Sequence, residues 1–408
     1  MKNIGSMLTR SELSKQVEEH VIPLCVPEIR GNEWTYVKEC LDTNWVSSVG
    51  PFVDRFERMV GNYVGTKYAV ATMNGTAALH VALLVAGVQP DDEVLVSTLS
   101  FIAPANAIRY VGAWPVFVDA EPDYWQMDPE KVKEFLAEGC RWRNGALYNQ
   151  HTGRRIKAIL PVHILGHPCD LDPILACARK YNLVVIEDVA ESLGARYKGR
   201  KVGQLGDISC LSFNGNKIVT AGGGGMVLTG NEAWARRAKY LTVQAEDDAL
   251  SRIHQEIGYN YRLTNLQAAI GCAQLERLDE YIVAKRQIAT AYRRAFERIS
   301  NMIVPQEAPW AFSIYWLYTV LMDGIEGEDH SRRIAKCLLS SGIQARLLWQ
   351  PLHLSPAHRG AYACSCDVAE RIFNSALSLP SSVGLSATDQ DRVIQRLREI
   401  AENEWKVV

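Results

Sequence analysis

Between residues 65 and 230, strand-like and helix-like segments alternate along the chain, and few folds accommodate such a pattern. The strand-like segments are short, apolar runs, and the segments between them repeat apolar residues every three or four positions. Continuously apolar strands joined by helical crossovers indicate a sheet covered on both faces. We therefore predict an α/β fold with a mostly parallel sheet between helices. The expected strands are residues 67–72, 93–97, 115–119, 156–162, 183–187, 208–213 and 226–229.

Beyond residue 230 the pattern becomes mainly helical. It predicts helices over 231–241 and 266–296, then turns, short strands such as 315–322, and a closing helix on which Val393, Leu397 and Ile400 share one face. An Arg-, Gly- and Asn-rich stretch at 137–155 indicates a surface insertion. We expect three parts, namely an N-terminal arm (1–30), a large α/β domain (31–285) and a smaller C-terminal α+β domain (286–408).

Composition excludes several classes of protein. The chain has 408 residues, 48% hydrophobic and 22% charged, with a formal net charge of −2. It therefore lacks the overall positive field that attracts nucleic acid or an anionic membrane. The apolar stretch 77–88 is too short to span a bilayer. The ten cysteines are scattered, with only Cys364 and Cys366 close together, so we predict free thiols and a cytoplasmic location.

Four short motifs carry possible chemistry. Asn74-Gly75-Thr76-Ala77 lies at a strand-to-helix turn, where free amides favour an anion, although a plain helix cap also fits. A buried-type strand ends at Asp188, where ligands of open α/β sheets bind, although many strands end in Asp. Lys217 follows Ser212 in a loop next to a glycine run, where a carbonyl could be bound covalently or the lysine could simply be solvated. Gly258-Tyr259-Asn260-Tyr261-Arg262 is either a contact surface or an aromatic turn.

Taken together, these motifs meet the requirements of pyridoxal phosphate. This cofactor needs a cradle for its phosphate, an acid for its ring nitrogen, a lysine for its aldehyde and a side chain that stacks on its ring. Thr76, Asp188, Lys217 and Phe101 can fill these four roles.

Here the chain resembles the DegT-type nucleotide-sugar aminotransferases, over roughly residues 21–405. Those enzymes have the fold of aspartate aminotransferase, which is fold type I of the pyridoxal phosphate enzymes. The resemblance rests on the order of five segments: Trp45 to Gly50, Asn74 to Leu79, Glu187 to Ser192, Ser212 to Lys217 and Gly258 to Arg262.

The resemblance implies a role for individual residues. Lys217 would form the internal aldimine and move protons, and Asp188 would pair with the pyridine nitrogen. Glu191 stands where most of the family has Gln, near the cofactor's phenolic oxygen, and a proton on Glu191 would relieve the repulsion there. Phe101 would stack on the ring, and Asn260 would reach the cofactor of the neighbouring subunit, so the active unit would be a homodimer. The implied phosphate ligands are Gly75, Thr76 and Ser212.

The resemblance also implies a reaction and a range of substrates. L-glutamate would convert the cofactor to pyridoxamine phosphate, which would then aminate carbon 4 of a keto sugar in a ping-pong sequence. The expected sugar is UDP-linked 4-keto-6-deoxy-N-acetylglucosamine, as in the bacillosamine and legionaminic acid pathways. The alternative is the GDP-4-keto-6-deoxymannose of GDP-perosamine synthases. A sugar dehydratase, which has His in place of the lysine, and a non-catalytic nucleotide-sugar binding protein are the other classes considered.

Three further residues are candidate sugar contacts, His163, Trp349 and His353. His163 fits a turn or a pocket wall, and ordinary interface packing explains Trp349 and His353 at least as well. His163 and His167 have a spacing that suits zinc on a helix, but Gly166 and Pro168 break a helix there, so no metal site is predicted.

Overall fold

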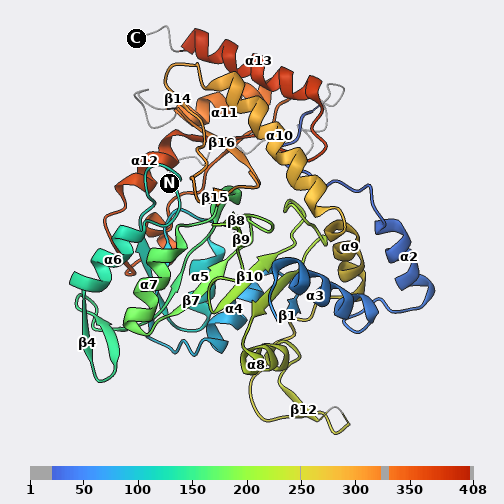
Figure 1. Ribbon diagram of the computed structural model, residues 1–408, viewed down its shortest axis with the longest axis vertical. Coiled ribbons are helices and arrows are strands. Elements are labelled where there is room, and N and C mark those ends of the chain that lie inside the picture. The colour runs from blue at the N-terminus through green and yellow to red at the C-terminus, as the bar shows by residue number, and fades with distance from the viewer. Residues whose placement is uncertain (1–20, 249, 323–329, 405–408) are drawn as a thin grey trace, which may run out of the picture.

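A ten-stranded, mostly parallel sheet forms the centre of the protein (Figure 1). The computed structural model describes residues 21–248, 250–322 and 330–404. Along the main path the strand order is β1-β11-β10-β7-β6-β2-β3-β18, and only β11 runs antiparallel to its neighbours. The α/β prediction is therefore confirmed. The strands are β1 (Tyr68–Thr72), β2 (Glu93–Ser97), β3 (Trp114–Val118), β6 (Arg155–Leu160), β7 (Val184–Asp188), β10 (Ile208–Ser212), β11 (Gly225–Thr229) and β18 (Tyr362–Ala363).

Helix α4 (Gly75–Val85) shows why these residues form a layered core. Its residues from Ala77 to Leu83 are all buried, because the helix packs on β10 and β11 and also contacts neighbouring helices. A helix that is apolar on all of its sides is stable only where it is buried in the interior of the protein. The other helices of this unit are α2 (Glu33–Asp42), α3 (Pro51–Val64), α5 (Ala103–Tyr110), α6 (Pro129–Glu138), α7 (Leu171–Tyr181), α8 (Glu232–Thr242) and α9 (Asn265–Leu275).

A second, smaller unit has its own sheet and its own hydrophobic cluster. Its strands are β14 (Met302–Ile303), β16 (Tyr318–Met322), β17 (Arg346–Leu347) and β19 (Ala376–Leu379), all antiparallel. Helices α10 (Leu278–Phe296), α11 (His330–Ser340) and α13 (Ala387–Glu404) gather at this end of the molecule, and α12 (Asp367–Ser375) lies beside it (Figure 1).

Helix α10 connects the two units. Its first turns contribute Leu278 and Ile282 to the large hydrophobic cluster, and Tyr292 and Phe296 further along belong to the small one. The expected boundary between residues 285 and 286 falls inside this helix. In the described part of the N-terminal arm, Ile22 packs in the small cluster and Leu24 in the large one, so the arm contacts both units.

Three expected segments differ from the structure. The helix expected over 266–296 is two helices, because Arg277 leaves the helical conformation, with φ −112° and ψ 6°. The strand expected from 315 begins only at Tyr318, since Tyr315 has a positive φ of 47°. The insertion at 137–155 contains a hairpin of β4 (Cys140–Arg143) and β5 (Ala146–Asn149) that extends the large sheet beside β6.

The remaining strands are short: β8 (Arg196–Tyr197), β9 (Arg200–Lys201) and β15 (Ala311–Phe312) form one small sheet, and β12 (Glu246–Asp248) pairs with β13 (Ile253–His254). Within the described ranges, none of the helices combines the length and the apolar character that a bilayer crossing requires.

Candidate active site

A cavity of about 650 Å³ lies at one edge of the large sheet. Strands β1, β2, β6, β7 and β10 run in the same direction, so their carboxyl ends meet at this edge. The structure brings together there most of the side chains that the sequence predicts for a cofactor site. The lining includes Gly75, Thr76, Phe101, Asp188, Glu191, Ser212, Lys217 and Trp349.

One end of the cavity is built to hold an anion. The Asn74 side chain accepts a hydrogen bond of 2.8 Å from the Ala77 amide and so caps helix α4. Gly75 lies so close to Ser212 that a Cβ on Gly75 would stand 2.9 Å from the Ser212 Cβ. The first-turn amides of a helix have no acceptor within the helix and favour a phosphate. The Thr76 and Ser212 side chains line the same end, so this cradle fits the cofactor phosphate.

Asp188 lies at the carboxyl end of β7 and is only 3% exposed. Burial raises the pKa of its carboxyl group, although a hydrogen bond from the Ala190 amide and the charge of Lys217 lower it. A protonated ring nitrogen in the cavity would give this carboxylate a partner of opposite charge. The ring of Phe101, which is 56% exposed, lines the same cavity and offers an apolar face to a planar ligand.

Lys217 and Glu191 face each other inside the cavity. The Lys217 Nζ lies 3.5 Å from Glu191 Oε1, while Glu191 Oε2 accepts a hydrogen bond of 2.9 Å from the Leu165 amide. Burial raises the pKa of Glu191, and the charge of Lys217 opposes this effect. The pair therefore places an amine and a proton-accepting carboxyl group within reach of one ligand.

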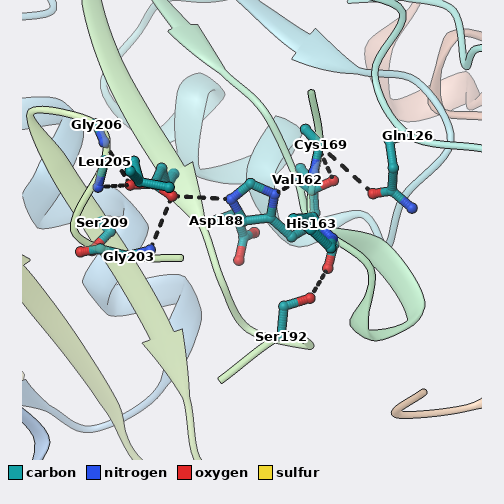
Figure 2. Close-up of polar contacts among 12 residues, drawn as sticks. Gln126, Val162, His163, Cys169, Asp188, Ser192, Gly203, Leu205, Gly206 and Ser209 are labelled. Carbon is teal, nitrogen blue, oxygen red and sulfur yellow. Dashed lines mark hydrogen bonds and ion pairs between the residues drawn. The ribbon is translucent and has the colours of Figure 1, made fainter. Parts of the chain in front are cut away.

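His163 is not among the residues that line the cavity; its side chain is fully buried, and both of its ring nitrogens take part in the buried network of Figure 2. The Cys169 amide donates to its Nδ1 at 2.9 Å, so the ring proton lies on Nε2, 3.1 Å from Glu187 Oε2. The structure thus gives His163 a partner in the sheet core instead of the expected sugar contact. His167 is also engaged, with its Nε2 accepting from the Ala308 amide.

Glu187 is the centre of this buried network. Its carboxylate accepts hydrogen bonds from His163 and from the amides of Gly203, Leu205 and Gly206 (Figure 2). Burial alone would raise the pKa of Glu187, but the hydrogen bonds lower it below its ordinary value. A buried, ionised carboxylate therefore sits directly before Asp188 in the chain.

Two other predicted residues lie away from the cavity lining. His353 is held between the Thr98 hydroxyl, at 2.8 Å, and Glu370, at 3.0 Å. Asn260 is exposed and pairs with Val243 in an isolated antiparallel bridge. The structure therefore engages the His353 side chain with Thr98 and Glu370 and leaves Asn260 exposed.

Sequence reasoning missed Trp316 and Arg346, which line the cavity from the smaller unit. Both come from the region beyond residue 300, where the sequence offers no motif and their position depends on how the two units pack. Arg346 is exposed on β17, where its backbone pairs with Ser378, and its side chain has no hydrogen-bond or ion-pair partner within the described ranges. It is therefore a cation available to an anionic ligand.

Fold and site together define a pyridoxal phosphate-dependent enzyme of fold type I. The profile of the DegT/DnrJ/EryC1/StrS aminotransferase family matches residues 27–398, so the chain belongs to this family. It is a sugar aminotransferase.

Named relatives and a solved structure agree with this class. The GDP-perosamine synthase of Caulobacter vibrioides is 40% identical over 93% of this chain and 98% of that protein. The GDP-perosamine synthase of Escherichia coli O157:H7 is 38% identical over 90% of this chain and 94% of that protein. The crystal structure of DesI in the presence of its TDP-sugar product matches with a TM-score of 0.81 and 28% identity, covering 94% of this chain and 93% of that one.

Proposed function

We propose that this enzyme transfers an amino group from L-glutamate to carbon 4 of GDP-4-keto-6-deoxymannose, which is the reaction of a GDP-perosamine synthase. The observation that carries this proposal is the similarity to relatives of that name, at 38–40% identity over at least 90% of the chain. The UDP-linked N-acetyl sugar expected from the sequence motifs becomes the second candidate.

The cavity supports transamination because its residues fit the cofactor. Gly75, Thr76 and Ser212 would hold the phosphate, and Asp188 would hold the ring nitrogen in its protonated form. When bound, pyridoxal phosphate supplies an electron sink that makes the proton next to the reacting nitrogen removable. Phe101 would cover one face of the ring and exclude water from it.

Lys217 is the residue that moves the proton. Its Nζ lies inside the cavity, and among the described residues its ion-pair partner is Glu191, with the Nζ 3.5 Å from Oε1. An amine held at one point can remove a proton from the α-carbon of the donor in the first half-reaction and deliver a proton to carbon 4 of the sugar in the second. Glu191 would hold a proton close to this amine, as its raised pKa indicates.

Arg346 would bind the anionic groups of the substrates. L-glutamate carries carboxylates and the sugar nucleotide carries two phosphates, and in a ping-pong reaction they occupy the cavity in turn. An arginine without a partner matches both oxyanions geometrically. Trp349, which lines the same cavity, would supply an apolar wall. A volume of about 650 Å³ is in the range of small-molecule sites.

We also propose that the active unit is a homodimer completed by Asn260. This residue is exposed and away from its own cavity, and Ile257, in the same loop, is 83% exposed. An exposed apolar side chain beside a polar contact residue suits burial against a second copy. Light scattering of the purified protein would measure the assembly, and a monomer with full activity would refute this part.

The test of the substrate compares two keto sugars. The enzyme, supplied with pyridoxal phosphate and L-glutamate, is given GDP-4-keto-6-deoxymannose or UDP-4-keto-6-deoxy-N-acetylglucosamine, and the product mass and 2-oxoglutarate are measured. We expect kcat/KM to favour the GDP sugar by about a hundredfold or more, as base-specific hydrogen bonds allow. A preference for the UDP sugar would establish the second candidate, and loss of a hydroxyl without gain of nitrogen would indicate a dehydratase.

A further inference from the structure

Trp316 makes two contacts with the loop that carries Lys217. Its indole Nε1 donates a hydrogen bond of 2.7 Å to the carbonyl of Asn216, which immediately precedes Lys217. The face of its ring lies 4.0 Å from the Lys217 Nζ. Trp316 is 3% exposed, so both contacts are shielded from bulk water. One side chain from the smaller unit therefore fixes both the backbone before Lys217 and the position of its amine.

The backbone on both sides of Trp316 is held firmly. Lys285 on α10 is 2% exposed, and its Nζ donates to the carbonyls of Trp316, at 2.8 Å, and Ser381. On the other side, Gly166 packs so closely that a Cβ on Gly166 would lie 2.6 Å from the backbone nitrogen of Trp316. The Ile314 amide also donates to the Gly166 carbonyl at 2.9 Å. These contacts leave the indole little freedom to move away from Lys217.

The position of the amine matters because Glu191 competes for it. A direct lysine–carboxylate hydrogen bond normally has an N–O distance of about 2.7–2.9 Å. The observed distance between Lys217 Nζ and Glu191 Oε1 is 3.5 Å, with the amine over the Trp316 ring. In direct contact the charge of Lys217 would lower the pKa of Glu191 further, so Glu191 would ionise and form an ion pair that keeps the lysine protonated. A protonated amine can neither attack a carbonyl nor accept a proton. The ring attracts the ammonium form, but it holds the charge more weakly than a direct ion pair and offers no proton acceptor, so the amine loses its proton more easily over the ring than against the carboxylate.

We propose that Trp316 is a positioning residue that keeps the Lys217 amine away from Glu191 and available for reaction. The inference rests on the proposed role of Lys217 and extends it to a residue more than 90 positions further along the chain. Trp316 and Glu191 draw the same Lys217 amine in different directions, so the effect of removing the indole depends on whether the Glu191 carboxylate is present.

The experiment measures how fast purified full-length protein, freed of cofactor, attaches pyridoxal phosphate at Lys217 with loss of one water. The visible absorption band reports the rate, and borohydride reduction followed by peptide mass analysis confirms the site. We expect Trp316→Leu to slow attachment by about tenfold, in keeping with a buried cation–aromatic contact. Trp316→Phe retains an aromatic face and is expected to slow it by about threefold or less.

The double variant Trp316→Leu/Glu191→Gln separates positioning from simple damage. Without the Glu191 carboxylate, the amine loses the ion-pair partner that it has among the described residues, so attachment should return to within about threefold of Glu191→Gln alone. Trp310→Leu is the matched control, because it removes an indole from the same stretch that contacts Tyr124 and Tyr197 but not Lys217. It should attach cofactor at the wild-type rate.

Each outcome supports or overturns the proposal. Wild-type attachment by folded Trp316→Leu, an equal loss in Trp310→Leu, or no recovery in the double variant would overturn it. If circular dichroism shows that Trp316→Leu does not fold, Trp316→Phe and Trp316→Phe/Glu191→Gln carry the same comparison. A wild-type protein that attaches no cofactor at Lys217 would instead refute the proposed function.

Discussion

Replacing Glu187 with Gln tests whether the buried carboxylate behind Asp188 stabilises the protein. The wild-type carboxylate accepts hydrogen bonds of 2.9, 2.8 and 2.6 Å from the amides of Gly203, Leu205 and Gly206, and one of 3.1 Å from His163. A Gln side chain keeps one acceptor oxygen and places an NH2 group against the donors on the other side. His163 cannot relieve the conflict by moving its proton, because its Nδ1 accepts from the Cys169 amide.

The magnitude follows from the lost contacts. A hydrogen bond to a charged group contributes about 1.5–3 kcal/mol, and two are lost. We therefore expect Glu187→Gln to lower the free energy of unfolding by about 3–5 kcal/mol, which is typical of a broken buried pair. At about 2 °C per kcal/mol for a large domain, Tm should fall by roughly 6–10 °C. Thermal melts by circular dichroism and urea unfolding would measure both quantities.

The same carboxylate predicts a pH dependence. Because the folded-state pKa of Glu187 lies below its ordinary value of 4.5, its contribution is complete above about pH 4.5. It is lost as the pH falls through the folded-state pKa. The difference in Tm between wild type and Glu187→Gln should therefore be constant near neutral pH and shrink below pH 4.5.

Glu93 on β2 provides the matched control. It is equally buried, but its side chain accepts one close hydrogen bond, 2.8 Å from Asn149, and Arg154 lies 3.7 Å away. Burial raises the pKa of Glu93, so ionisation there opposes folding, and Glu93→Gln should change stability by less than about 1 kcal/mol. Equal melting temperatures for Glu187→Gln and Glu93→Gln would refute the reasoning.

Three further predictions concern the cavity. Lys217→Ala should lose turnover and covalent attachment of pyridoxal phosphate, and normal turnover would exclude its assigned role. Gly75→Val should weaken pyridoxal phosphate binding by about tenfold or more, measured by fluorescence titration, because its Cβ would press on Ser212; unchanged affinity would place the phosphate elsewhere. Since burial raises the pKa of Glu191 while Lys217 opposes it, the wild-type pH–rate profile should contain an ionisation above the ordinary carboxyl range that Glu191→Gln lacks, and identical profiles would count against a proton on Glu191.

The sequence by itself determined the large sheet and most of the cofactor cavity. Short apolar strands alternating with helical segments require parallel pairing, and parallel strands end at a common edge. Residues at or just beyond the carboxyl ends of those strands, such as Gly75, Asp188 and Ser212, are therefore brought together. The sequence did not reveal the break at Arg277, since the apolar periodicity continues through it.

Only the tertiary structure decided which side chains line the cavity from segments outside the large sheet. Trp316 and Arg346 reach it because helix α10 and the small sheet carry the second unit over the large one, and no local pattern encodes that approach. The same applies to His163, which follows a strand as the site residues do but turns into the sheet core toward Glu187. The position of a residue along a strand is a local property of the sequence. Whether its side chain enters the cavity or the core depends on hydrogen-bond and packing partners from distant parts of the chain.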